Sequence, residues 1–126
     1  MTEEELLLYF YEIGFEKYLN KLAQKLTNKK VIIYGCGLAF QTMLKYFDFS
    51  NFNIIGIYDS RFETNPQKDF QNFKVLTKND FNNVDYILLS TWNSIDITHS
   101  LQDYKVKIKP LINKKFKDVL KEIWEG

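Results

Sequence analysis

Several features that would narrow the function are scarce in this sequence of 126 residues. It contains one cysteine and one histidine, so an intramolecular disulfide, a cysteine-based metal site and a multi-histidine site are excluded. Seventeen basic residues against sixteen acidic ones leave a formal charge of +1. A near-neutral chain gives no electrostatic reason to expect nucleic acid as a partner. We therefore expect neither a metal site nor nucleic-acid binding.

Long hydrophobic runs are also lacking. The apolar run Leu6–Tyr11 is far shorter than the roughly 20 residues that cross a bilayer as a helix. Acidic residues Glu3–Glu5 precede it, where a secretory signal carries positive charge. The sequence thus predicts a protein with no membrane segment that works in the cytoplasm.

What the chain does contain is enough apolar material for one core. Hydrophobic residues make up 45% of it and charged residues 26%, which is typical of a globular domain. Its 126 residues suffice for one domain and are too few for two ordinary ones. The aromatic content of 17% fits either a bulky core or an exposed docking surface.

Apolar spacing predicts that helices alternate with strands. We expect strands at 31–34, 53–58, 73–76, 84–89 and 106–108, and helices at 2–12, 16–26, 38–47, 94–104 and 113–124, with a brief helix after residue 77. A capping box at Thr2–Glu5 marks the first helix, the segment 60–72 is polar with a turn, and Pro110 should stop the last strand. The central strands are apolar on both faces, as in a parallel sheet covered on two sides. The expected fold is α/β, one doubly wound parallel sheet of about five strands. Residues 1–28 would form a helical extension and 29–126 the sheet domain.

The most informative segment is a strand that runs into a glycine turn. The apolar run Val31–Tyr34 leads to Gly35-Cys36-Gly37, and an amphipathic helix follows. Glycine allows a tight turn and a close approach of ligand to backbone, and a helix N-terminus favours an anion. This pattern predicts a phosphate or nucleotide site, whose expected residues are Gly35, Cys36, Gly37, Leu38, Ala39 and Phe40.

Two further segments should meet this loop, because ligands of such sheets bind at the carboxyl ends of the strands. They contribute the candidate binding residues Asp59, Ser60, Arg61, Ser90, Thr91, Trp92 and Asn93. Asp59 has the spacing from the loop of an acid that accepts ribose hydroxyls, or it is an ordinary turn residue. Arg61 would pair with a phosphate, stack on a base, or be a solvated loop cation. Trp92 would stack on a base, or cover the sheet end without any ligand.

Catalytic residues stay unassigned at this stage. Cys36 lies beside a helix N-terminus but has no cysteine partner, and we expect it to line the loop rather than to react. His99 is expected on a helix surface. An enzyme would have to use His99, Tyr34, Tyr58 or nearby carboxylates. The run Leu6–Tyr11 is apolar all around its helix, so it packs on the core or docks a second copy or a partner enzyme.

Four stretches in this order together carry a resemblance to a known group. They are the glycine loop with its helix, the strand end Gly56-Ile57-Tyr58-Asp59, the short run Lys74-Val75-Leu76 and the run Asp85-Tyr86-Ile87-Leu88-Leu89-Ser90-Thr91-Trp92-Asn93. They resemble the Rossmann-like domains of bacterial sugar-modifying enzymes. Such domains stand at the front of hexapeptide sugar O-acetyltransferases and nucleotide-sugar dehydratases, and at the C-terminal end of sugar C-methyltransferases. The resemblance covers roughly residues 30–112.

The resemblance implies a Rossmann-like fold that binds a nucleotide, a dinucleotide or a nucleotide-sugar, with NAD or a nucleoside-diphosphate sugar as the ligand. Gly35, Gly37 and Asp59 would be the binding positions. Phe40 departs from the pattern, which has a small residue at that place, and Ala39 is the candidate to provide the close packing instead. No hexapeptide repeat, methyltransferase domain or dehydratase domain accompanies it in this sequence.

The expected function is therefore a nucleotide or nucleotide-sugar binding module in bacterial carbohydrate modification, not catalytic alone. One alternative is a small NAD-dependent oxidoreductase or a sugar transferase subunit. Another is a protein-interaction module with a vestigial ligand loop, in which the N-terminal helices form a homodimer or dock a partner.

Overall fold

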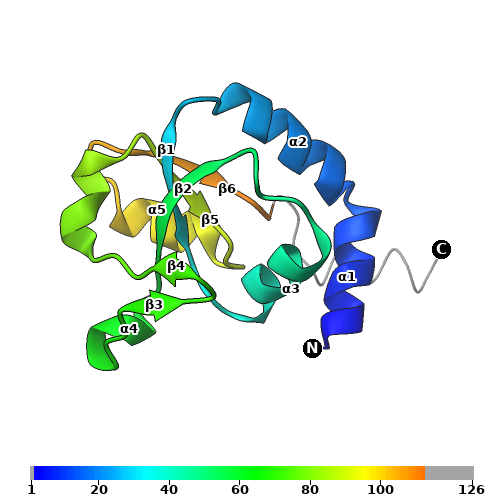
Figure 1. The fold of residues 1–126 in the computed structure, drawn as a ribbon, viewed down its shortest axis with the longest axis horizontal. Helices are drawn as coiled ribbons and strands as arrows, with labels where there is room; N and C mark the ends of the chain where they lie inside the picture. The colour runs from blue at the N-terminus through cyan, green and yellow to red at the C-terminus, as the bar shows by residue number, and fades with distance from the viewer. Residues whose placement is uncertain (1, 113–126) are drawn as a thin grey trace.

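Four parallel strands form the central sheet in the computed structural model, which describes residues 2–112 (Figure 1). The strands are β1 (Lys30–Tyr34), β2 (Asn53–Tyr58), β5 (Tyr86–Leu89) and β6 (Lys107–Pro110). Their order across the sheet is β2-β1-β5-β6, and each neighbouring pair is parallel. The chain therefore moves outward from β1 to β2 and later returns to the opposite side of β1. The strand order reverses between β1 and β5.

The strand expected at 73–76 is split between two partners, which corrects the expected count of about five strands to four in this sheet. Its first residues form β4 (Phe73–Lys74), an antiparallel hairpin with β3 (Asp69–Phe70). Only Val75 joins the sheet, through a single parallel bridge to Ile57 at the outer edge of β2. The segment 60–72, expected to be an irregular polar stretch, contains β3 and the short helix α4 (Arg61–Thr64).

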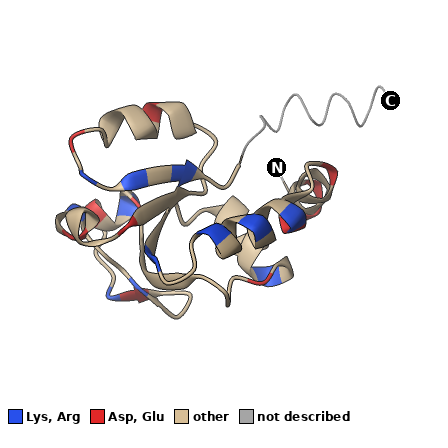
Figure 2. Cartoon of the chain, turned by 90° about the horizontal axis from the view of Figure 1, so that it is seen from above, with Lys and Arg blue, Asp and Glu red and all other residues tan. Residues whose placement is uncertain are grey.

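Successive residues of β1 point into two separate cores, as the doubly apolar strands predict. Val31 and Ile33 pack with α1 (Glu3–Glu12), α2 (Phe15–Lys25) and α3 (Leu38–Tyr46). Ile32 packs with the 3₁₀ helix η1 (Lys78–Asn83) and α5 (Ser94–Ser100) on the other face. Figure 2 shows α5 on one side of the sheet and α1 and α2 on the other, with lysines along β6. The sheet is thus covered on both faces.

The first helix begins where its capping signal predicts. Thr2 Oγ1 accepts a hydrogen bond from the Glu5 amide at 3.1 Å, and the Glu5 carboxylate accepts one from the Thr2 amide at 3.3 Å. Leu6, Tyr9 and Phe10 are fully buried in the same core as α3. The apolar helix therefore packs on the sheet layer, which confirms the core-packing interpretation for these three side chains.

Other expectations hold less closely toward the end of the described chain. Helix α5 stops at Ser100 instead of 104 and begins after Asn93, without a side-chain cap from that residue. Pro110, expected to stop the last strand, is instead its final residue. The helix expected at 113–124 lies outside the described residues. Among residues 2–112, no helix is long and apolar enough to cross a membrane.

Candidate functional site

A cavity of about 490 Å³ opens at the carboxyl ends of β1, β2 and β5, next to the point where the strand order reverses. All three segments proposed from the sequence reach it, and α1 adds a fourth. The lining residues are Leu6, Gly35, Gly37, Leu38, Ala39, Asp59, Ser90, Thr91, Trp92 and Asn93. Its volume lies within the roughly 300–1,000 Å³ common for small-molecule sites.

Gly35 is required by its backbone and by its neighbours. Its φ of +106° lies in the region that side-chain-bearing residues rarely adopt. A Cβ there would stand 2.6 Å from Thr91 Cγ2 and 2.8 Å from Ser90 Oγ. Ser90 Oγ donates a hydrogen bond to the Gly35 carbonyl at 2.5 Å. The end of β5 is thereby pressed against the glycine loop.

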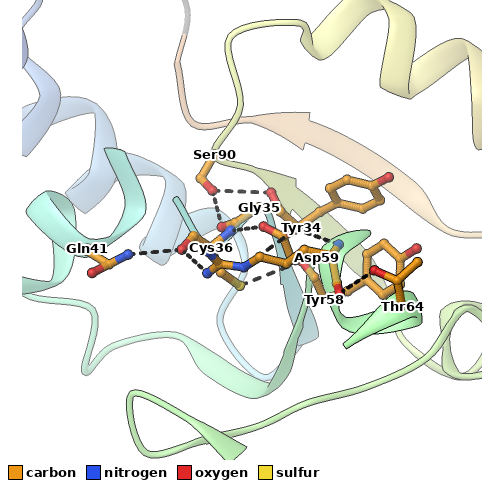
Figure 3. A network of polar contacts seen from close by, with 9 residues as sticks. Tyr34, Gly35, Cys36, Gln41, Tyr58, Asp59, Thr64 and Ser90 are labelled. Atoms are coloured by element: carbon orange, nitrogen blue, oxygen red, sulfur yellow. Dashed lines mark hydrogen bonds and ion pairs between the residues drawn. The ribbon is translucent and has the colours of Figure 1, made fainter. Parts of the chain in front are cut away.

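The backbone of Cys36 is held by side chains at both its amide and its carbonyl, which belong to two consecutive peptide groups (Figure 3). Its amide donates to Asp59 Oδ2 at 2.8 Å. Its carbonyl accepts from Arg61 Nη2 at 2.7 Å and from Gln41 Nε2 at 3.2 Å. The other Asp59 oxygen, Oδ1, accepts from the Arg61 amide at 3.0 Å. Asp59 and Arg61, which follow β2, therefore both bind the glycine loop.

The Cys36 thiol is not suited to nucleophilic chemistry. Its side chain is fully buried, and Sγ lies 3.8 Å from the Tyr58 carbonyl oxygen. Burial first and the Asp59 charge second raise the pKa of the thiol to about 12, although the Arg61 charge opposes the shift. A thiol with that pKa is protonated at neutral pH, in line with the sequence expectation that Cys36 does not react.

Backbone amides at the start of α3 remain open, while the two before them are used. The Gly35 amide donates to the Tyr58 carbonyl at 2.8 Å, and the Cys36 amide is held by Asp59. Within residues 2–112, the amides of Gly37, Leu38 and Ala39 have no hydrogen-bond acceptor. A Cβ on Gly37 would meet no atom within 4 Å. The cavity therefore contains the unpaired end of a nine-residue helix, which favours an anion.

Phe40 does not block this site. It is fully buried, and its ring centroid lies 6.2 Å from those of Phe49 and Phe73 in the core. The bulky residue is tolerated because it points away from the loop, while the neighbouring Ala39 lines the cavity. Ala39 thus holds the place that the sequence proposed for a small residue.

Four of the predicted site residues do not line the cavity, and they are Cys36, Phe40, Ser60 and Arg61. The Arg61 guanidinium lies 5.1 Å from the ring centroids of both Phe62 and Phe70, in addition to its bond to the loop. Ser60 is exposed and directly precedes α4, where its side chain makes no cap. The structure thus gives Arg61 a place that the sequence did not predict, beside the loop and against two aromatic rings.

Leu6 and Trp92 form the apolar side of the cavity. The Trp92 ring is 41% exposed and meets Tyr9 edge to face, with ring centroids 5.4 Å apart. No sequence signal placed Leu6 at the site, because the apolar pattern of its helix says that it packs but not where. Thr91 Oγ1 is buried and has no hydrogen-bond partner in the described chain. Such an orphaned group calls for a water or a ligand.

Apart from Asp59, the groups suited to acid–base chemistry that the sequence proposed lie outside the cavity lining. Among the lining residues there is one carboxylate, Asp59, and neither Lys nor Arg. His99 is exposed on α5 and is not part of the lining. Tyr58 donates its hydroxyl proton to Glu63 at 2.5 Å, and burial, followed by that bond, raises its pKa. Tyr34 packs on Tyr58, with ring centroids 4.8 Å apart.

No family model, curated protein or solved structure matches the chain.

Proposed function

We propose that the protein binds a nucleotide or nucleotide-sugar in this cavity, and that it serves carbohydrate modification as a binding module. The observation that carries the proposal is the set of three unpaired amides, of Gly37, Leu38 and Ala39, that line a cavity at the strand-order reversal. A phosphate fits such a helix end because the amides donate to its oxygens and the helix dipole favours its charge.

The remaining lining fits the rest of such a molecule. Trp92 offers a half-exposed aromatic face for a base, and Asn93 beside it has both a donor and an acceptor for a base edge. Each Asp59 oxygen accepts one hydrogen bond within the described chain, Oδ2 from Cys36 and Oδ1 from Arg61, so each retains a lone pair for a further donor.

The fold part of the proposal is a Rossmann-like domain. Counting the Val75 bridge as a rudimentary outer strand, the order is Val75-β2-β1-β5-β6, with the glycine loop after the first strand. That order parallels the first five strands of the doubly wound order 3-2-1-4-5-6, in which the ligand lies at the switch point, and this likeness supports the proposal. The link to bacterial sugar-modifying enzymes, and a cytoplasmic location, rest on the sequence alone.

The two alternatives receive less support from the contacts. An oxidoreductase or transferase needs an acid or base beside its ligand, and the lining offers only Asp59, whose two oxygens already bind the loop. An interaction module built on α1 would use its apolar face, yet Leu6, Tyr9 and Phe10 are buried in the core.

A thermal-shift panel tests the proposal. It contains nucleoside monophosphates, nucleoside diphosphates, UDP-glucose and NAD, each at millimolar concentration. A ligand that binds the folded state raises the melting temperature in proportion to the logarithm of its concentration over its Kd. If no member of the panel raises it, the proposed function is wrong.

Variants at Gly37 locate the binding. Gly37 has extended backbone dihedrals and precedes α3, so Gly37→Asp and Gly37→Asn both place a capping oxygen on the open amides. Each should stay within a few tenths of a kcal/mol of the native stability, because glycine is itself an acceptable N-cap. Gly37→Asp adds a negative charge and should abolish the ligand shift, whereas the neutral Gly37→Asn should weaken it. An undiminished shift in Gly37→Asp would place the ligand elsewhere.

A further inference from the structure

Arg61 joins its own helix α4 to the glycine loop and to the β3–β4 hairpin. Its guanidinium donates to the Cys36 carbonyl at 2.7 Å, across 25 positions of chain. The same group packs on Phe62 of α4 and on Phe70 of the β3–β4 hairpin, at 5.1 Å from each ring centroid. Its own amide donates to Asp59 at 3.0 Å. A flexible lysine has no planar group that makes these contacts together.

Asp59 holds the preceding peptide group. While Arg61 holds the Cys36 carbonyl, which belongs to the Cys36–Gly37 peptide, Asp59 Oδ2 holds the Cys36 amide, which belongs to the Gly35–Cys36 peptide, at 2.8 Å. The two side chains also lie near each other, with Arg61 Nε 3.9 Å from Asp59 Oδ1. Two consecutive peptide planes are thus each fixed by a charged group, and such hydrogen bonds are stronger than neutral ones.

The orientation of the Cys36–Gly37 plane, which Arg61 holds, determines where the Gly37 amide points. Gly37 follows Cys36 directly, and its amide is the first of the open amides at the start of α3. Rotation of this peptide would turn the Cys36 carbonyl away from Arg61 and would turn the Gly37 amide with it, since both groups lie in one peptide plane. A loop that holds these amides outward before any ligand arrives loses less entropy on binding.

We infer that Arg61 and Asp59 are positioning residues of the ligand loop: they hold the two peptide groups on either side of Cys36 so that the amides of Gly37, Leu38 and Ala39 stay open to the cavity. The inference rests on the proposed function for what the amides bind, but the positioning itself is a property of the unliganded chain. It gives Arg61 a role that requires no contact with the ligand.

The single cysteine of the chain reports on this loop directly. Cys36 is fully buried in the loop that Asp59 and Arg61 hold, so a thiol reagent reaches its sulfur only when the loop opens or the whole chain unfolds. We would measure the rate at which 5,5′-dithiobis(2-nitrobenzoate) labels the full chain at pH 8. Urea unfolding of each variant gives the rate that global unfolding alone would produce.

Arg61→Gln should label roughly tenfold faster or more than the native chain, beyond what its global stability accounts for, because a charged hydrogen bond is lost. Arg61→Lys keeps the charge without the planar guanidinium, and its labelling rate should lie between those of Arg61→Gln and the native chain. Lys45→Gln is the matched control, since it removes the same charge from an exposed pair with Glu3 and should label at the native rate. Gln41→Met removes only the 3.2 Å bond and should have a smaller effect than Arg61→Gln.

Adenosine and uridine mono- and diphosphates form the ligand arm. Their affinity for Arg61→Gln should fall in step with the increase in loop opening, and similarly for all four. Arg61→Gln labelling at the rate set by its global stability overturns the inference, even if nucleotides bind. If Arg61→Gln destabilises the whole chain, the comparison uses Arg61→Lys instead. The inference is overturned if Arg61→Lys and the native chain label at the same rate after correction for global unfolding. Faster labelling with no nucleotide bound to the native chain leaves the loop result standing and refutes the proposed function.

Discussion

A Cβ atom on Gly35 would lie 2.6 Å from Cγ2 of Thr91, so the first residue of the glycine loop and the end of β5 are matched in shape. The same residue has a φ of +106°, which adds backbone strain to the clash for any other side chain. The cavity wall therefore depends on this one position having no side chain.

Gly35→Ala should consequently lower the free energy of unfolding by at least about 2 kcal/mol, from strain together with overpacking. Gly37→Ala is the matched control, because its Cβ would enter open space from ordinary backbone dihedrals, and it should cost below about 1 kcal/mol. Urea denaturation of both variants gives the comparison. Equal losses would mean that the clash at Gly35 relaxes without cost.

Thr91→Val should raise the stability of the unliganded chain. Its Oγ1 is buried without a partner, and a buried unpaired hydroxyl costs about 1–3 kcal/mol, part of which the isosteric methyl recovers. Thr42→Val makes the opposite case, since Thr42 is buried and its Oγ1 donates to the Leu38 carbonyl at 2.7 Å. That variant should lose about 1 kcal/mol in the same urea experiment. A loss in both would show that the Thr91 hydroxyl is paired in solution.

Stability should decline as the pH rises above about 9, because of Cys36. Burial raises the pKa of its thiol from the ordinary 9.0 to about 12. Between those values the unfolded chain releases the proton and the folded chain keeps it, so the free energy of unfolding falls by up to about 1.4 kcal/mol per pH unit. Tyr34 and Tyr58, whose pKa values burial also raises, add to the decline only above pH 10. Urea midpoints at pH 8, 9 and 10 should therefore fall in the native chain and less in Cys36→Ala. Parallel curves for the two would contradict the assignment.

Shortening a side chain on the buried face of α1 should lower the stability more than shortening one on its exposed face. Leu6 is fully buried in the core and beside the cavity, so Leu6→Ala should cost about 2–5 kcal/mol. Leu8 is 45% exposed on the same helix, and Leu8→Ala should cost below about 1 kcal/mol. The melting temperatures of the two variants decide this. Comparable small effects would mean that residues 1–28 are a detachable extension rather than part of the core.

Local patterns in the sequence predicted much of this architecture. The capping box of Thr2 and Glu5 marked the start of α1, and the expected strand 53–58 matches β2 at both ends. The glycine turn after β1 correctly indicated a loop that reaches a cavity. These signals succeed because each depends on neighbours within a few residues: capping geometry, strand alternation and glycine dihedrals.

The parts that were not predicted depend on contacts between distant segments. Arg61 was considered as a phosphate partner, a base partner or a solvated cation, yet it binds a carbonyl 25 positions away. Val75 was expected within a full strand, but pairing of Phe73 with Phe70 leaves it a single bridge to the sheet. Leu6 reaches the cavity because α1 packs on α3. Nothing in the local spacing of these residues encodes such tertiary choices.

The outer strands explain why this sheet ends where it does. At one boundary β6 carries the exposed Lys107 and Lys109 and finishes in Pro110, which has no amide to donate. At the other boundary the bridge from Val75 occupies part of β2. A strand from a neighbouring molecule that approached the sheet would meet the ammonium groups of β6 at one edge. At the other edge, the bridge from Val75 already pairs with part of β2. We therefore expect this protein, even at high concentration, to resist forming fibrils by strand pairing at either edge of the sheet.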